Sequence, residues 1–279
     1  MLSRLFLCSL AALGLLVSSQ AQAGVVAEIP VEYSSGYLWL KVQPAGQRET
    51  LNFILDSGAA SSVLDLNAAR RLALRLGGRV PVQGVHSRTT AHYIERFNAQ
   101  ASGITLPKSL LALDLSMVSR TCDRPIDGLL GADFFHGRIV QIDFAAGKLR
   151  ILDRAPVSEC CAVLPMKQRN GTFCVPVGVA GNPSRWMRVD TGCDSTLEWV
   201  INGAGDRRHA GTSIGLTNTR TRSLITDVQL GSHTLPGVKA GIHDQQMFPG
   251  EAGLLGNALL ARFCVTIDTP GGRLLLASK

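Results

Sequence analysis

Two aspartates end similar short segments that lie far apart in the chain. Asp56 follows the apolar run in NFILDSG, and Asp190 follows the one in MRVDTG. The glycine two residues after each aspartate lets the backbone turn sharply and present its amides. Two carboxyls about 3 Å apart share one proton and titrate as a unit. One member can then take a proton from water while the other donates to a carbonyl oxygen, which hydrolyses a peptide without a covalent intermediate.

A single Asp-Ser-Gly most often marks a turn or a helix cap, but here it belongs to an internal repeat. The two aspartates follow Pro30 and Pro165 at almost the same spacing. Between each proline and its aspartate lies a turn glycine, Gly46 or Gly181, at an equal distance from the proline. The segments QASGITLP and QLGSHTLP match in length, as do DGLLGADFF and AGLLGNALL, and each of the latter pair leads into a run ending in Ile-Asp. We therefore expect two homologous lobes that bring both carboxyls to one interface.

The elements that must position the aspartates are predicted to be strands. Short apolar and β-branched runs bounded by Gly, Pro or Asn recur along the chain, with no alternation of strands and long helices. Helices are expected only at 65–74, with Asp65 as N-cap, and after the two Leu-Leu-Gly triplets. The predicted fold is all-β with two barrel-like lobes and a cleft between them. We assign the lobes to 24–152 and 163–279, joined by a linker at 153–162.

These motifs resemble the aspartic peptidases of the pepsin and retropepsin type, in a compact bacterial two-lobed form. The resemblance rests on FILDSGAASSVL and MRVDTGCDSTL, each followed later by Leu-Leu-Gly. It implies that Asp56 and Asp190 form the catalytic dyad. It also implies roles for their neighbours, with Ser57 and Thr191 bracing the two loops and Gly58 and Gly192 placing amides beside the carboxylates. The triplets 129–131 and 254–256 would pack behind the loops.

The resemblance also implies a β-hairpin flap over the substrate. By position the flap falls within 81–97, where Tyr93 is the candidate for its aromatic residue. The alternative is that Tyr93 is an ordinary hairpin side chain.

The chain departs from the family pattern just after each glycine. Ala59 and Cys193 occupy positions where pepsin-like enzymes have a hydroxyl that bonds the charged carboxylate. Loss of that hydrogen bond raises a carboxyl pKa. We therefore predict that the dyad keeps its shared proton to higher pH than in pepsin, with activity closer to neutral.

The segment 1–23 is predicted to be a signal peptide cut after Ala23. Arg4 precedes an apolar run that is too short to span a bilayer comfortably, and Ala21-Gln22-Ala23 ends it. The alternative is an uncleaved anchor. We expect a periplasmic or secreted protein with no membrane segment after cleavage. In an oxidising compartment an even number of cysteines suggests disulfides of unknown pairing among Cys122, Cys160, Cys161, Cys174, Cys193 and Cys264.

Charge and composition limit the partners that we expect. The net charge of +7 becomes +6 without the leader, and no basic arm carries interleaved aromatics, so nucleic acid is excluded as an expected partner. Histidines are scattered without metal-ligand spacing, and the proposed chemistry needs only water and two carboxyls. We expect no cofactor or metal, a monomer, and an extended peptide or protein as substrate.

The sequence leaves three alternative functions. The first is a non-catalytic peptide-binding protein on the same fold. The second is a serine hydrolase with Ser213 as nucleophile, since GTSIG at 211–215 fits G-x-S-x-G. That motif requires a strand, a sharp turn and a helix, and the sequence after it favours a strand. The third, a glycosidase, has no support beyond the number of acidic residues.

Overall fold

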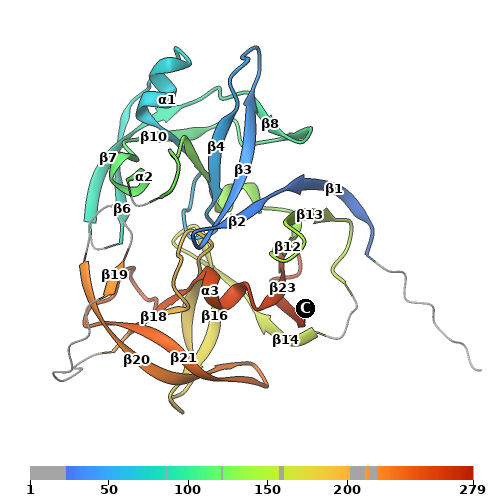
Figure 1. The fold of residues 1–279 in the computed structure, drawn as a ribbon, viewed down its shortest axis with the longest axis vertical. Helices are drawn as coiled ribbons and strands as arrows, with labels where there is room; N and C mark the ends of the chain where they lie inside the picture. Colours follow the sequence, from blue (N-terminus) through green and yellow to red (C-terminus); the bar gives the residue numbers. More distant parts are fainter. Residues whose placement is uncertain are drawn as a thin grey trace, which may run out of the picture.

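The structure is a computed structural model, and it describes residues 23–85, 87–120, 122–156, 160–201, 211–213 and 219–278. The predicted leader therefore lies outside the described residues, apart from Ala23. Strands make up more than half of the described residues and helices 7%, so the predicted all-β fold is confirmed. Figure 1 shows two lobes, one above the other, with further strands between them at one side.

The first lobe is built on one sheet with the strand order β6-β7-β10-β5-β11-β4-β3-β8-β9, and β2 pairs with β3. Its strands are β2 (Glu32–Ser34), β3 (Tyr37–Pro44), β4 (Leu51–Leu55), β5 (Val63–Asp65), β6 (Arg79–Gly84), β7 (Ser87–Ile94), β8 (Ala99–Ala101), β9 (Ile104–Thr105), β10 (Leu110–Leu113) and β11 (Gly128–Leu130).

The second lobe has a sheet with the order β15-β16-β17-β22-β18-β21-β20-β19. Its strands are β15 (Lys167–Arg169), β16 (Thr172–Val179), β17 (Arg185–Val189), β18 (Leu197–Val200), β19 (Gly211–Ser213), β20 (Thr219–Leu230), β21 (His233–His243) and β22 (Gly253–Leu255).

A third sheet joins the two halves of the chain. Its order is β1-β13-β12-β23-β24-β14, and the two halves meet where β12 pairs antiparallel with β23. β14 begins within the linker that we assigned to 153–162. The strands are β1 (Val25–Pro30), β12 (Ile139–Asp143), β13 (Lys148–Leu152), β14 (Cys160–Pro165), β23 (Phe263–Asp268) and β24 (Arg273–Ser278). Because both halves contribute strands equally, this sheet holds the lobes in one arrangement.

The sequence repeat is also a structural repeat. In the first lobe β11 lies between β4, to which it is parallel, and β5, to which it is antiparallel. In the second lobe β22 lies in the same way between β17 and β18. Each aspartate follows the parallel partner of a Leu-Leu strand. The same three-strand unit therefore presents each aspartate.

The few helices lie where the sequence predicts them. α1 (Leu66–Arg71) is N-capped by Asp65, whose Oδ1 accepts from the amides of Asn67 and Ala68. The 3₁₀ helix η1 (Ala132–Phe134) and α3 (Asn257–Leu260) follow the two Leu-Leu-Gly triplets, and α2 (Ser116–Ser119) is an additional short turn. Among the described residues, no helix has the length and apolar character to cross a membrane.

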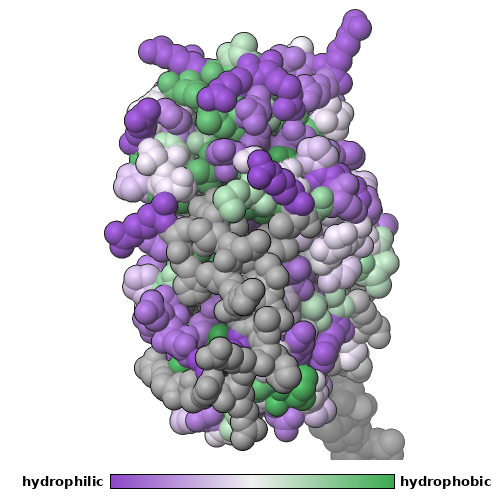
Figure 2. Space-filling view, turned by 60° about the vertical axis from the view of Figure 1, so that its left-hand side comes forward, coloured by the Kyte–Doolittle hydropathy of each residue, from purple (hydrophilic) through white to green (hydrophobic). Residues whose placement is uncertain are grey.

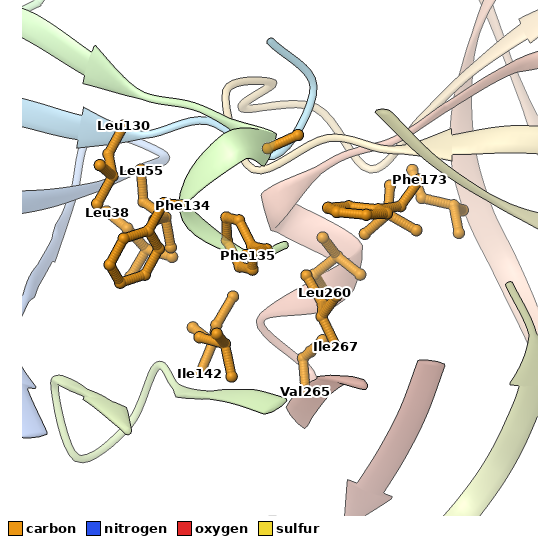
Figure 3. Packing of buried hydrophobic residues seen from close by; sticks show 14 of the residues in the cluster. Leu38, Leu55, Leu130, Phe134, Phe135, Ile142, Phe173, Leu260, Val265 and Ile267 are labelled. Carbon is orange, nitrogen blue, oxygen red and sulfur yellow. The ribbon is translucent and has the colours of Figure 1, made fainter. Parts of the chain in front are cut away.

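One apolar core extends through both lobes and the joining sheet. Figure 3 shows Phe135 between Leu55 and Phe134 on the first-lobe side and Leu260 and Phe173 on the second. Phe135 and Phe173 meet edge to face with ring centroids 6.0 Å apart. Buried aromatic rings of this size contribute strongly to packing, so the lobe interface is fixed by the core itself.

The described surface on the side of β6 and β7 is mostly hydrophilic, with small separate apolar areas (Figure 2). Scattered exposed apolar residues are ordinary on proteins, so this side shows no large apolar interface in its described part.

Candidate active site

Each aspartate is fixed at the end of its strand by the Leu-Leu strand beside it. The amide of Asp56 donates to the carbonyl of Leu130, and the amide of Asp190 donates to that of Leu255, both at 2.9 Å. Gly131 leaves no room for a side chain against Ser61, and Gly256 leaves none against Ser195. The Leu-Leu-Gly triplets therefore support the two aspartate loops from behind.

The two aspartate loops face each other across the lobe interface. A Cβ on Gly58 would lie 2.3 Å from the carboxyl carbon of Asp190, and one on Gly192 would lie 2.5 Å from that of Asp56. Each glycine therefore lies directly against the carboxyl of the other lobe. A side-chain hydrogen bond joins the two carboxyls. The structure thus brings together the two aspartates singled out in the sequence, while their catalytic role stays a prediction.

A reciprocal set of hydrogen bonds locks the two loops together. The amide of Ser57 donates to Thr191 Oγ1 at 2.9 Å, and the amide of Thr191 donates to Ser57 Oγ at 3.1 Å. Ser57 Oγ donates in turn to the carbonyl of Val189, and Thr191 Oγ1 donates to that of Leu55, both at 2.8 Å. Both side chains are completely buried. These hydroxyls join the two loops by hydrogen bonds across the lobe interface.

The backbone donors around the two carboxyls are unequal. Asp56 Oδ1 accepts from the amides of Gly58 and Ala59, both at 3.0 Å. Asp190 Oδ1 accepts only from the amide of Gly192, at 2.9 Å, among the described hydrogen bonds. The Cys193 thiol lies 3.2 Å from Ser195 Oγ, with which it forms a hydrogen bond. Amide donors stabilise a charged carboxylate, so they favour the charge on Asp56.

The pKa values of the carboxyls follow from burial and from this asymmetry. Burial and then the charge of Asp56 raise the pKa of Asp190 to about 7. Burial also raises the pKa of Asp56, but the amides of Ala59 and Gly58 oppose the increase. The hydrogen bond between the carboxyls lowers the pKa of Asp56 and raises that of Asp190. These interactions favour the shared proton on Asp190 and the charge on Asp56.

Residues 40–134 match a family model described as aspartyl protease. The resemblance to the aspartic peptidases is confirmed. The part of the chain that matches this family model is about a third of its length. It contains the Asp56 loop, the β6–β7 hairpin and the first Leu-Leu-Gly triplet. Asp190 lies outside that segment, but it occupies the equivalent place in the structural repeat. No curated protein matches the chain.

The flap region expected of an aspartyl protease contains the hairpin of β6 and β7. Its strands pair from Arg79 and His92 to Gly84 and Ser87, and Figure 1 shows it reaching from the first lobe toward the second. Val85, in the turn, packs on a second-lobe cluster formed by Val200, Met247, Phe248 and Leu254. The turn therefore contacts both lobes.

Tyr93 lies at the other end of that hairpin. Its backbone pairs with Gly77 and Gly78, and its side chain is 48% exposed. The described contacts of Tyr93 do not connect it with either aspartate loop, so its role as flap aromatic stays a prediction. Position in the hairpin, rather than aromatic character, identifies Val85 as the residue in contact with the second lobe.

Two residues near the dyad belong to no motif that the sequence predicts as functional. Tyr37, at the start of β3, is buried, and its hydroxyl has no hydrogen-bond partner among the described residues. Burial, followed by the charges of Asp194, Cys122, Cys193 and Asp190, raises the pKa of the Tyr37 phenol. A tyrosine at a strand start gives no signal of such a position. Arg188 forms a buried ion pair with Glu251, and its presence two residues before Asp190 was a signal that went unused.

The predicted disulfides are not supported, because no disulfide joins the described residues. The thiol of Cys174 is enclosed in the core, and the thiol of Cys193 faces Ser195. Burial raises the pKa of both thiols. The side chains of Cys160 and Cys161 lie outside the described part of the chain. Cys193, three residues after Asp190, forms no disulfide with another described residue.

The serine-hydrolase alternative does not fit the fold. Ser213 ends β19, and its backbone pairs with Thr219 at the start of β20. The described strands before and after residues 214–218 therefore pair with each other, whereas a nucleophile elbow leads from a strand into a helix.

Proposed function

We propose that the protein is an exported aspartic endopeptidase in which Asp56 and Asp190 activate a water molecule between them. The observation that carries this proposal is the reciprocal contact of Gly58 with Asp190 and of Gly192 with Asp56. It gives the two carboxyls a common site at the lobe interface. The aspartyl protease match over residues 40–134 supports peptidase chemistry in general.

The proposed reaction begins with Asp56 ionised and Asp190 protonated. Asp56 takes a proton from the water, whose oxygen bonds to the scissile carbonyl carbon, while Asp190 donates its proton to the carbonyl oxygen. The product of this step is a tetrahedral gem-diol. Asp56 then donates its proton to the amide nitrogen, the C–N bond breaks, and one gem-diol hydroxyl returns a proton to Asp190. The dyad ends in its starting state, and one water is consumed for each bond cut.

We propose an extended peptide as the substrate, bound between the lobes beneath the β6–β7 hairpin. The contact of Val85 with the second-lobe cluster supports this position, because a hairpin that touches both lobes can exclude water from the dyad. Without water, the electrostatic interactions of the carboxyls are stronger.

The test is a map of cleavage sites on a denatured protein mixture. Peptide termini are identified by mass spectrometry after incubation with the wild type, Asp56→Asn or Asp190→Asn. We expect new internal termini with the wild type and background levels with both variants. Equal termini in all three samples would reject the dyad as the catalyst.

The alternative is a peptide-binding protein without activity. It predicts that the wild type produces no new termini, yet binds peptides whose affinity is unchanged by Asp56→Asn. The intact pair of aspartates and their hydrogen-bonded loops favour the enzyme, since a binding protein does not need the second carboxyl.

Export is proposed from the segment 1–23 alone. Expression of the chain with and without this segment, followed by fractionation and N-terminal sequencing, tests it. We expect the full chain to leave the cytoplasm and begin at Gly24. A mature protein that keeps Met1 and stays in the cytoplasm would contradict export, but it would leave the peptidase proposal untouched.

A further inference from the structure

A buried ion pair lies beside the dyad on the side of the second lobe. Among the described residues, the first lobe has no equivalent ion pair. Arg188 Nε donates to Glu251 Oε2 at 2.7 Å, and Arg188 Nη2 donates to Glu251 Oε1 at 2.8 Å. The side chains are only 4% and 2% exposed. Two parallel hydrogen bonds between a guanidinium and a carboxylate fix the geometry of both groups.

The first lobe has two isoleucines at the equivalent positions. Ile54 lies two residues before Asp56, as Arg188 lies two residues before Asp190. Ile126 lies three residues before the Leu-Leu pair of its lobe, as Glu251 does in the other. Both isoleucines are buried in one apolar cluster. A buried ion pair is often no more stable than the apolar pair that could replace it, so packing of this unit does not require the charges.

The third donor of Arg188 crosses the lobe interface. Its Nη1 donates to the carbonyl of Gly58 at 2.7 Å, in the loop that follows Asp56. The guanidinium also lies over the ring of Phe248, with its central carbon 3.4 Å from the ring centroid. Asn170 Nδ2 donates to Glu251 Oε1 at 2.8 Å and so fixes the counter-ion. The Arg188 guanidinium therefore contacts Glu251, the Gly58 carbonyl and the Phe248 ring.

We propose that Arg188 is a positioning residue of the dyad. From the second lobe it holds the Gly58 carbonyl of the first aspartate loop, and its buried charge favours the state in which one carboxyl is ionised. Glu251 orients Arg188 and limits the effect of its charge. This inference rests on the proposed function.

The charge of Arg188 acts on both carboxyls. Burial raises the pKa of both aspartates, and the charge of Arg188 opposes that increase at each of them. Other charged or titratable groups lie near the dyad, near Arg188 or near the residues that contact them. They are Glu251, Arg169, Cys174, Cys193, Asp194 and Tyr37.

The first test transfers the isoleucine pair of the first lobe to the second. The variant Arg188→Ile/Glu251→Ile removes both charges and is expected to fold, because the first lobe already contains this arrangement. We expect the acid limb of kcat/KM to move up by about 0.5–1 pH unit, since a nearby cation lowers a carboxyl pKa. We expect kcat to fall at least about tenfold through displacement of the Gly58 loop, with KM within about twofold.

The second test removes the negative charge of the ion pair and keeps the positive one. Glu251→Gln keeps a hydrogen-bond acceptor for Arg188 but removes the counter-charge, so the acid limb should move to lower pH. Opposite shifts in the two variants identify an electrostatic role. Loss of activity at all pH values without movement of either limb would mean a structural role only, and would overturn the proposal.

A third measurement separates this inference from the proposed function. Carboxyl ¹³C NMR titration follows the aspartates without any substrate, and Asp190→Asn assigns the signals. If the wild type cleaves no peptide but the dyad titrates higher in Arg188→Ile/Glu251→Ile, the function is wrong and the inference stands. If the wild type cleaves peptides and the dyad titrates alike in both proteins, the inference is wrong.

Discussion

Gly58 of the first lobe lies directly against Asp190 of the second, so close that a Cβ would be 2.3 Å from the carboxyl carbon. Gly192 has the same relation to Asp56. The glycines are required at these positions because each carboxyl occupies the space that a side chain would need. Each lobe therefore contributes one carboxyl and one glycine to this reciprocal contact.

Alanine at Gly58 or Gly192 should therefore disturb the dyad more than the fold. We expect kcat to fall about 100-fold or more, because a misplacement of about 1 Å has that effect. The free energy of unfolding should fall by about 1–3 kcal/mol from overpacking. Gly78→Ala is the matched control, since a Cβ there would meet nothing within 4 Å. Full activity in Gly58→Ala would show that Gly58 does not lie directly against the Asp190 carboxyl.

The hydroxyl of Thr191 should be important for stability as well as for the dyad. Thr191→Val leaves the amide of Ser57 and the carbonyl of Leu55 without their buried partner. Each such group destabilises the fold by about 1–3 kcal/mol, which urea denaturation measures. Thr105→Val, at an exposed position, should have little effect. Equal stabilities for the two variants would argue against the lock between the loops.

Activity should extend toward neutral pH. Burial and the charge of Asp56 raise the pKa of Asp190 to about 7, so the dyad keeps its shared proton through mildly acidic conditions. The proposed reaction needs that proton on Asp190 and a charge on Asp56. A profile of kcat/KM against pH is expected to show activity that continues above pH 5 and is still present at about pH 6. A strictly acidic optimum, with no cleavage above about pH 5, would contradict this account.

The stability of the fold should also depend on pH through the proton on Asp190. A carboxyl whose pKa is higher in the folded state than in the unfolded chain binds its proton more tightly when folded. Its contribution is complete below the ordinary aspartate pKa of about 3.9 and is lost as the pH rises through about 7. Tm of the wild type should therefore fall between about pH 4 and 7, and that of Asp190→Asn should fall less. Parallel curves for the two proteins would show that Asp190 titrates normally.

The turn of the β6–β7 hairpin should govern substrate binding. Val85→Asp places a charge against Met247 and Phe248, so closure of the hairpin becomes unfavourable. We expect KM to rise about tenfold while the free energy of unfolding changes little. Thr90→Asp adds the same charge at an exposed position of β7. A similar KM for both variants would separate the hairpin from substrate binding.

The sequence predicts the parts of the fold that belong to the internal repeat. Asp56 and Asp190 are recognisable because the same motifs surround both, and Asp65 because a cap precedes a helical segment. Long-range contacts of single residues are not predictable in this way. The bond from Arg188 to the Gly58 carbonyl joins residues 130 positions apart, and the equivalent Ile54 gives no indication of it. The aromatic ring of Tyr93 predicts a role in the flap, whereas contact with the second lobe depends on position in the turn and is made by Val85.

The central claim is that two carboxyls from different lobes hydrolyse peptides together. It is tested most directly by kcat/KM for one cleaved peptide in the wild type, Asp56→Asn and Asp190→Asn, with folding of each confirmed by circular dichroism. The account predicts a loss of about 1,000-fold or more in each variant, because neither carboxyl can activate water alone. Wild-type cleavage in either folded variant would contradict it.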